Sequence, residues 1–307
     1  MTNRTHPVSI VLTLAATLGA ISGCKSTELA TFETPEEAIR AIADVAGTGD
    51  HERIEQLFGP DGVELLRSGD EVADREDALT VKRQIQERLA FEEASAGTKI
   101  ALLGADGWPF PIPLVPEQGR WRFDVEAGRE ELANRRIGRY ELLTIATLHE
   151  YVEAQREYRS AARDGNPPAY ARALISSDGK HDGLYWPAAP GEAESPLGPL
   201  VAAAADEGYK RQEAGPTPFH GYLYRALTGQ GSNAPGGKKS YLDERGLLTR
   251  GFALLAWPAK YGNSGVMTFQ VNQQGLVYQL DLGPDTAAIA ARITAYAPDE
   301  SWDPTGD

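Results

Sequence analysis

The stretch RRIGRYELLTIATLHEYVEAQREY, from Arg135 to Tyr158, decides how the chain is divided. It lies within a longer segment, roughly Glu130 to Arg163, in which apolar and small side chains recur every three or four residues. That spacing places them on one face of an α-helix, and the Gly/Pro-rich DGNPP at 164–168 ends it. The inward face consists of Ile137, Tyr140, Thr144, Thr147, Leu148, Tyr151 and Tyr158.

The segment before this helix predicts helices followed by strands. Thr34 can cap a helix whose first turn holds Pro35 and Glu37, an arrangement typical of a capping box. Asp50 is expected to begin a second helix and Asp74 a third. The period of two that is typical of strands follows in TKIALLG (98–104), WPFPIPLV (108–115) and RWRFDV (120–125), and the prolines favour an edge strand. We therefore expect an α+β domain over residues 32–128.

The segment after the long helix predicts a second α+β domain, over residues 129–297 with that helix included. Tyr170, Ala173 and Leu174 suggest a short helix. A Gly/Pro-rich loop covers residues 176–199, and loops of this length are usually functional or mobile. The other expected elements are a helix in LVAAAADEGY (200–209), strands in GYLYRALTG (221–229), GFALLAWPA (251–259) and GVMTFQVNQQGLVYQLDLG (265–283), and a terminal helix after Asp285. Residues 298–307 are expected to form a C-terminal tail.

The composition limits the classes of function. The chain has 307 residues and a formal net charge of −14, and its 30 Lys and Arg residues form no run. Such a surface repels phosphates, so we expect no nucleic-acid partner. Cys24 is the only cysteine, which excludes an internal disulfide and a paired-cysteine metal or redox site. The sequence also gives no reason to expect a cofactor.

Three short motifs fall short of the chemistry that they suggest. In HEYVE, a zinc-protease helix would need histidine where Glu153 stands, so His149, Glu150 and Glu153 fit a solvated helix face better than a cation site. GQGSNAPGGKKS (229–240) has glycine where a phosphate loop needs lysine, and a strand follows it. GNSGV (262–266) lacks a glycine of the nucleophile elbow and is typical of a turn.

The stretch SSDGKHDGLYWP (176–187) is the candidate ligand or loop site, with Asp178, His181, Asp182, Tyr185 and Trp186. A histidine flanked by a carboxylate can act as a general base or a metal ligand. The same Asp-Gly pairs are also ordinary turn chemistry. The regular alternation of a calcium-binding loop is missing.

Aromatic side chains on the strands of the first domain form a second candidate. Trp108, Phe110 and Trp121, together with Phe123, are expected to lie on these strands and could line a ligand pocket. Core packing is the simpler alternative, because alternation along a strand buries one face in any case.

The N-terminus is typical of a targeting segment. Arg4 supplies positive charge, and VSIVLTLAATLGA (8–20) is apolar but shorter than the roughly 20 residues of a spanning helix. ISGC (21–24) resembles the lipobox of bacterial lipoproteins. The resemblance implies a signal peptide over residues 1–23, a lipid on the thiol of Cys24 and a tether over 24–31. It also implies a periplasm-facing anchor in the cell envelope, with the outer membrane favoured because Lys25 is not the aspartate of inner-membrane retention. An ordinary secretory signal with an incidental cysteine is the alternative.

Two further resemblances concern the fold. TPEEAIRAIADVAGTGDHERIEQLFG (34–59) resembles the opening of the cone-shaped fold of nuclear transport factor two, which often leaves a pocket at its mouth. Arg135 to Tyr158, together with SGVMTFQVNQQGLVY (264–278), resembles the spine helix and sheet of type IV pilin heads. A pilin has an apolar membrane segment before its helix, where this chain has the charged FDVEAGREELANRR (123–136). Filament assembly by the ordinary route is therefore not expected.

Most of residues 32–297 also resembles an uncharacterised family of bacterial envelope proteins with this two-part layout. The segments that carry the resemblance are Thr34 to Ala38, DGLYWP (182–187), GYLYRALT (221–228), GVMTFQVNQQG (265–275) and DLGPDT (281–286). The resemblance implies no known reaction, since the function of that family is unknown.

These patterns favour a membrane-anchored envelope lipoprotein that binds a ligand or an envelope protein partner, or has a structural or assembly role, without catalysis. The alternative is a hydrolase that uses the mouth of the first domain or the loop from Asp178 to Trp186. A third interpretation is a participant in a secretion or pilus system.

Overall fold

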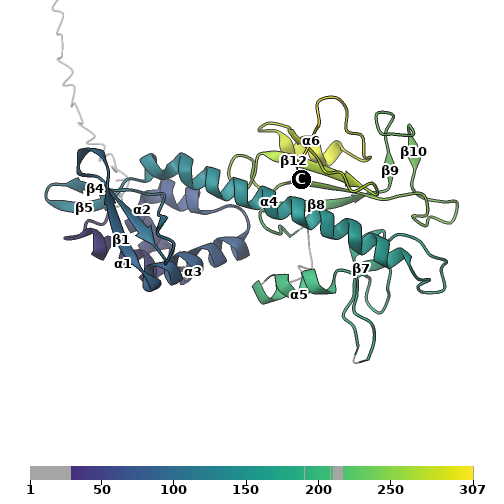
Figure 1. Cartoon of the computed structure of the whole chain (residues 1–307), viewed down its shortest axis with the longest axis horizontal. Coiled ribbons are helices and arrows are strands. Elements are labelled where there is room, and N and C mark those ends of the chain that lie inside the picture. Colours follow the sequence, from purple (N-terminus) through teal and green to yellow (C-terminus); the bar gives the residue numbers. More distant parts are fainter. Residues whose placement is uncertain (1–28, 190, 208, 210–216, 307) are drawn as a thin grey trace, which may run out of the picture.

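The computed structural model describes residues 29–189, 191–207, 209 and 217–306 (Figure 1). Within these ranges the chain mixes helices with antiparallel sheets, which confirms the predicted α+β class. No helix in the described part combines the length and the apolar character needed to cross a bilayer. The predicted signal peptide and Cys24 lie outside the described residues.

Three helices open the N-terminal unit: α1 (Pro35–Val45), α2 (His51–Leu66) and α3 (Glu71–Glu87). As predicted, the side chains of Thr34 and Asp50 accept hydrogen bonds from the first turns of α1 and α2. The predicted start of α3 at Asp74 is wrong. Asp70 caps that helix, accepting from the backbone N–H groups of Val72 and Ala73, whereas Asp74 accepts from the N–H of Ser68.

The N-terminal sheet has the order β1-β2-β4-β5, with β3 paired to β2 alone. Its strands are β1 (Leu89–Glu93), β2 (Lys99–Leu103), β3 (Trp108–Pro109), β4 (Leu114–Glu117) and β5 (Arg120–Phe123). Prolines remove the N–H groups that a longer β3 would need, so it stays a two-residue strand, in keeping with the predicted edge position. The turn between β4 and β5 uses Gln118 and Gly119, both with positive φ, as a tight hairpin requires.

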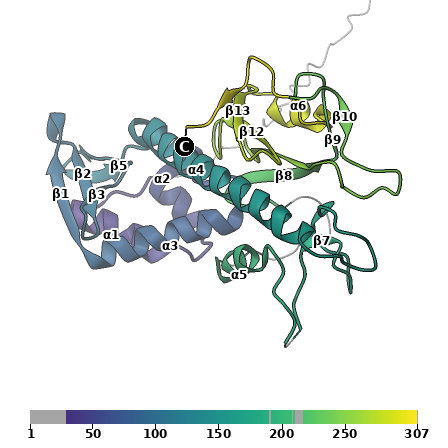
Figure 2. The same ribbon diagram turned by 45° about the vertical axis from the view of Figure 1, so that its right-hand side comes forward.

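Helix α4 (Val125–Arg159) follows β5 directly and joins the two units (Figures 1 and 2). Asp124 caps it by accepting a hydrogen bond from the N–H of Ala127, so the helix begins before the predicted Glu130. It contacts α2 in the N-terminal unit and both β7 and β12 in the C-terminal unit. The expected boundary at residues 128/129 therefore falls inside a continuous helix.

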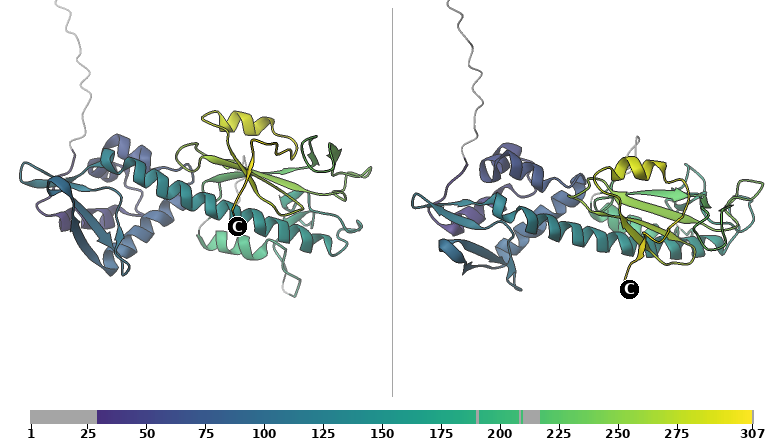
Figure 3. Two further views of the ribbon diagram at one scale, coloured as in Figure 1. Left: turned by 45° about the horizontal axis from the view of Figure 1, so that its top comes forward. Right: turned by 90° about the horizontal axis from the view of Figure 1, so that it is seen from above.

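The C-terminal sheet has the order β14-β13-β12-β11-β8. Its strands are β8 (Tyr222–Leu227), β11 (Ala253–Pro258), β12 (Met267–Asn272), β13 (Tyr278–Asp281) and β14 (Asp303–Pro304), the last within the expected tail. Helix α4 covers one face and α6 (Thr286–Arg292) the other (Figure 3). Strand β11 is buried on both faces: Leu254 and Ala256 belong to the core cluster that includes α4 residues, and Ala253 and Leu255 to the cluster of α6.

Two small sheets and one helix complete this unit. Strand β6 (Ala173–Ile175) pairs in parallel with β7 (Gly183–Tyr185), so the short helix predicted around Leu174 is wrong. Gly183 permits this pairing because a Cβ there would lie 2.5 Å from the carbonyl carbon of Ile175. Strands β9 (Gly229–Gln230) and β10 (Lys239–Ser240) flank the glycine-rich connection, and α5 (Gly198–Glu207) lies beside α3 (Figure 2).

Candidate ligand-binding cleft

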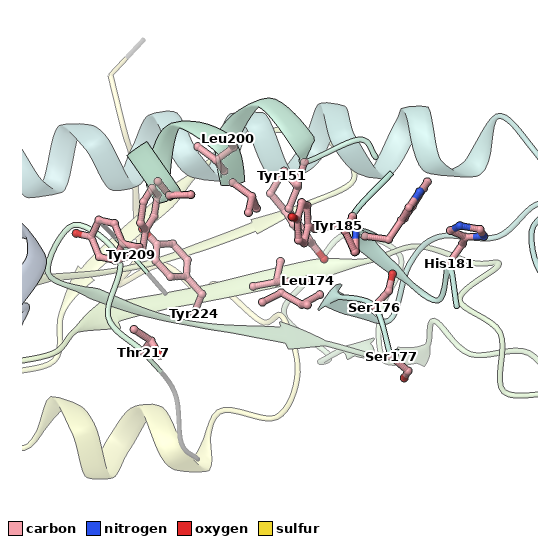
Figure 4. A pocket seen from close by; sticks show the side chains of 18 of the residues that line it. Tyr151, Leu174, Ser176, Ser177, His181, Tyr185, Leu200, Tyr209, Thr217 and Tyr224 are labelled. Carbon is pink, nitrogen blue, oxygen red and sulfur yellow. The ribbon is translucent and has the colours of Figure 1, made fainter. Parts of the chain in front are cut away.

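A cleft of about 1180 Å³ lies in the C-terminal unit, bordered by α4, α5, the β6–β7 pair and the α4-facing side of the sheet (Figure 4). Ligand sites are typically concave spaces of about 300–1,000 Å³ with mainly apolar walls. The volume of this cleft exceeds the upper end of that range, so the cleft has room for a large ligand.

The middle of the cleft is apolar. Leu200, Val201 and Ala204 line it from α5. Leu254 of β11 and Leu174 of β6 line other walls. Since these side chains offer no hydrogen-bonding group, this part of the cleft favours hydrocarbon or aromatic ligand atoms.

Two tyrosines add hydroxyl groups to this wall, and both stay neutral. Burial raises the pKa of Tyr224 to about 12, and burial also raises the pKa of Tyr151 above its ordinary range. The hydroxyl of Tyr151 accepts a hydrogen bond from Gln155 Nε2 at 3.0 Å, and that of Tyr224 lies 3.4 Å from Thr144 Oγ1. Both hydroxyls are therefore uncharged and already have hydrogen-bond partners within the protein.

One end of the cleft is attached to the N-terminal unit through Tyr209. Its ring packs edge-on against Phe219, with centroids 5.1 Å apart, and both residues line the cleft. Its hydroxyl donates to Oδ2 of the buried Asp70 at 2.8 Å, and the N–H of Gly221 donates to the same oxygen at 2.9 Å. The capping residue of α3 therefore also fixes a wall of the cleft. No local sequence signal indicates this contact, because Asp70 and Tyr209 are 139 residues apart.

The other end holds the predicted loop site. Asp178, His181, Tyr185 and Trp186 all line the cleft, and the His181 ring lies edge-on to Trp186 with centroids 4.6 Å apart. Asp182 does not join them. Its carboxylate accepts hydrogen bonds from the N–H and hydroxyl of Ser177, which hold its pKa below the ordinary range. The structure brings four of the five residues together, and their role in binding stays a prediction.

His181 lies between two carboxylates. Its Nδ1 is 3.4 Å from Asp164 Oδ1 and its Nε2 is 3.0 Å from Glu192 Oε1. A histidine base of a hydrolase needs one ring nitrogen within about 2.6–3.2 Å of a nucleophile. The nearby Ser177 hydroxyl donates to Asp182, and the Ser176 hydroxyl accepts from the N–H of Gly183. The geometry thus offers His181 as an ion-pairing group at the rim and not as a base aimed at a serine.

Other residues singled out from the sequence lie elsewhere. His149 and Glu150 are exposed on α4, and the exposed Glu153 pairs with Arg156, which matches a solvated helix face. Across the described ranges, no group of three or more His, Cys, Asp or Glu side chains is arranged to hold a metal ion.

The three aromatic residues predicted as a pocket lie in the N-terminal unit. Phe110 belongs to the core of that unit, and its ring lies 6.4 Å from the rings of Trp108 and Phe123. Trp108 and Trp121 are half-buried against the same core, with Lys99 Nζ 5.6 Å from the Trp121 ring centroid. These contacts are those of packing residues, and a pocket at this place stays a prediction.

A family model described as Protein of unknown function (DUF2950) matches residues 30–305. No curated protein is similar to the chain, and no solved structure is similar to it either. Because the model matches well over half of the sequence, the chain belongs to this family. The predicted membership of a family of unknown function is thereby confirmed.

Proposed function

We propose that this member of the DUF2950 family is a non-enzymatic ligand-binding protein held in the bacterial cell envelope by a lipid. The observation that carries the binding role is the cleft of about 1180 Å³, with its apolar middle and uncharged tyrosine hydroxyls. Sites of this type bind ligands by burying their apolar surface, while a few polar groups set orientation. The pairing of His181 with two carboxylates supports binding over hydrolysis.

The finer fold assignments belong to the same proposal. The N-terminal unit is proposed to be cone-like, and support comes from three helices packed against an antiparallel sheet. The C-terminal unit is proposed to be pilin-head-like, and support comes from a long helix that covers one face of an antiparallel sheet. Either fold hosts many functions, so the binding role rests on the cleft alone.

The lipid anchor at Cys24 is proposed from the ISGC motif. Acylation of the thiol and of the new N-terminus would give stable attachment, which one chain alone does not. We expect Cys24→Ser to release the protein from the membrane fraction or to leave its signal uncleaved. A variant that fractionates and migrates like the wild type would contradict the anchor. An envelope protein partner and a secretion-system role stay predictions.

The binding role is tested by filling the cleft. Ala204 lines it from α5, whereas Ala203 on the same helix does not and is exposed. We expect the wild type and Ala203→Trp to bind a neutral polarity-sensitive dye such as Nile red, and Ala204→Trp to lose that binding, because an indole occupies the apolar middle. Circular dichroism checks that both variants fold. Equal binding by both variants would overturn the proposal.

A further inference from the structure

We infer that the cleft selects elongated amphipathic ligands, with an apolar body along its middle and a cationic head group at the His181 end. This inference rests on the proposed ligand-binding function and names the ligand class for the same site.

The arrangement of the lining residues gives the cleft a long axis (Figure 4). Tyr209 and Thr217 lie towards one end, and Ser177 and His181 lie towards the other. Leu200 lies between them, with Tyr151 and Leu174 nearby. A ligand that fills this space must therefore be extended, with its hydrocarbon part in the middle, where polar atoms would lose water without finding partners.

Carboxylates outnumber cations at the His181 end. Besides His181, the charged side chains that line the cleft there are Asp178, Glu192 and Lys180, while Asp164, Asp182 and Arg163 border a smaller second pocket. Four of these six are acids. His181 contacts two of the four, yet both remain about one-third exposed, at 33% for Asp164 and 39% for Glu192. Of the two, Glu192 lines the cleft itself, so its charge and that of Asp178 face the space where a ligand head group would lie.

Aromatic rings at this end also favour a positively charged ligand group. Tyr185 and Trp186 line the cleft beside the carboxylates. The faces of aromatic rings attract cations within about 6 Å. Because the Arg163 guanidinium already lies 5.2 Å from the Trp186 ring centroid, we assign the contact with a ligand cation to Tyr185. An ammonium head group would meet both attractions, whereas a carboxylate, sulfate or phosphate would meet neither.

At the opposite end, the described residues that line the cleft, Tyr209, Thr217, Pro218 and Phe219, carry no positive charge. The hydroxyl of Tyr209 already donates to Asp70, so its nearest charged neighbour is another carboxylate. The chain as a whole carries a formal charge of −14, and such a field lowers the local concentration of anions and raises that of cations.

The test compares three amphiphiles with one decyl chain: decyltrimethylammonium, decyl maltoside and decyl sulfate. Their binding to the wild-type protein is measured by calorimetry below their micelle concentrations. We expect the cation to bind at least about tenfold more tightly than the anion, because two exposed ion contacts together can contribute a difference of this size. The difference should shrink in high salt, which screens exposed charges.

A matched pair of variants locates the head group. Glu192 lines the cleft, while Glu194 on the same loop is exposed and does not. We expect Glu192→Gln to weaken binding of the cation about threefold, within the range of one exposed ion pair, and to leave decyl maltoside unchanged. Glu194→Gln should change neither. Since Glu192 also accepts from the N–H of Ala189, Asp178→Asn serves as a second variant with the same expected direction.

The outcomes separate this inference from the function on which it rests. If the anion binds as tightly as the cation, or if Glu192→Gln and Asp178→Asn both behave like Glu194→Gln, the cationic preference is overturned while the cleft remains a ligand site. If all three amphiphiles bind equally to the wild type and to Ala204→Trp, the cleft is not the site and both proposals are overturned.

Discussion

The N-terminal and C-terminal units both pack aromatic side chains against an antiparallel sheet, but one set closes a core and the other borders a cleft. In the N-terminal unit, the Phe123 ring lies within 6.4 Å of three other phenylalanine rings and is 1% exposed. In the C-terminal unit, by contrast, the three tyrosines Tyr151, Tyr209 and Tyr224 line an open space.

The tyrosines of the cleft wall differ from these phenylalanines in their hydrogen bonds. Phenylalanine has no polar atom, so it can be surrounded completely. A buried tyrosine hydroxyl needs a hydrogen-bond partner, and here the partners are Gln155, Asp70 and Thr144. Each of these bonds fixes the direction of its ring, so the rings cannot collapse into the cleft to fill it. The hydrogen bonds of these tyrosine hydroxyls thus help to keep a large apolar space open.

The largest expected effect comes from one substitution made in both regions. Leu103 is fully buried in the N-terminal core, and Leu200 is half-buried at the cleft. We expect Leu103→Ala to lower the free energy of unfolding by about 3–5 kcal/mol, because it leaves a cavity in a packed core. Leu200→Ala should cost about 1 kcal/mol, since that side chain already faces open space. Urea unfolding followed by circular dichroism measures both. Equal losses would mean that the cleft is packed as tightly as the core.

A second effect is expected where the two regions meet. Gly221 has φ +75°, and a Cβ there would lie 2.4 Å from Tyr140 Cδ2 of α4. We expect Gly221→Ala to destabilise the protein by about 3 kcal/mol, combining backbone strain with overpacking. Gly237 has φ +72°, and no atom lies within 4 Å of its Cβ position. We therefore expect Gly237→Ala to cost only the backbone strain, about 1 kcal/mol. Thermal unfolding compares the stabilities of the two variants. Similar losses of stability would show that the contact of residue 221 with Tyr140 is loose.

The smallest effect is a pH dependence at the same junction. Burial lowers the pKa of His220 below its ordinary 6.5, against the opposing influence of the Glu207 and Asp70 carboxylates. The neutral ring is favoured in the fold, so the stability from this residue is complete above pH 6.5 and is lost as the pH falls through the lower folded-state pKa.

We therefore expect urea midpoints of the wild type to fall between pH 7 and pH 5 more steeply than those of His220→Asn. Asparagine tolerates the positive φ of 49° at this position, so the variant removes the titrating group without adding strain. Parallel curves for the two proteins would mean that His220 does not contribute to the pH dependence.

Local signals predicted most of the elements, and long-range contacts account for the errors. The caps at Thr34 and Asp50 are confirmed because their hydrogen bonds lie within one turn of the chain. The third helix was predicted to start at Asp74, whereas Asp70 caps it. The choice depends on Asp70 also meeting Tyr209 and Gly221, far along the chain. Likewise, Leu174 has an apolar neighbourhood that suits a helix, but the pairing of its neighbours Ala173 and Ile175 with Gly183 and Tyr185 makes this segment a strand.

The candidate site was predictable only in part. The loop from Asp178 to Trp186 was identified because its titratable and aromatic residues are adjacent in sequence. Tyr151 was expected on the inward stripe of the long helix, but periodicity does not distinguish a core from a cleft, since both need an apolar face. Tyr209 and Tyr224 were not identified, because the cleft that they line is formed by segments that only the tertiary fold brings together.

Helix α4 has a mechanical consequence. A continuous helix of 35 residues is about 52 Å long, and its two ends are packed in different units (Figure 1). The two units therefore share one continuous helix, and the contact of Tyr209 with Asp70 connects the cleft to the N-terminal unit a second time. These two connections fix the position of the cleft relative to the N-terminal unit, and so relative to residue 29, where the described chain begins.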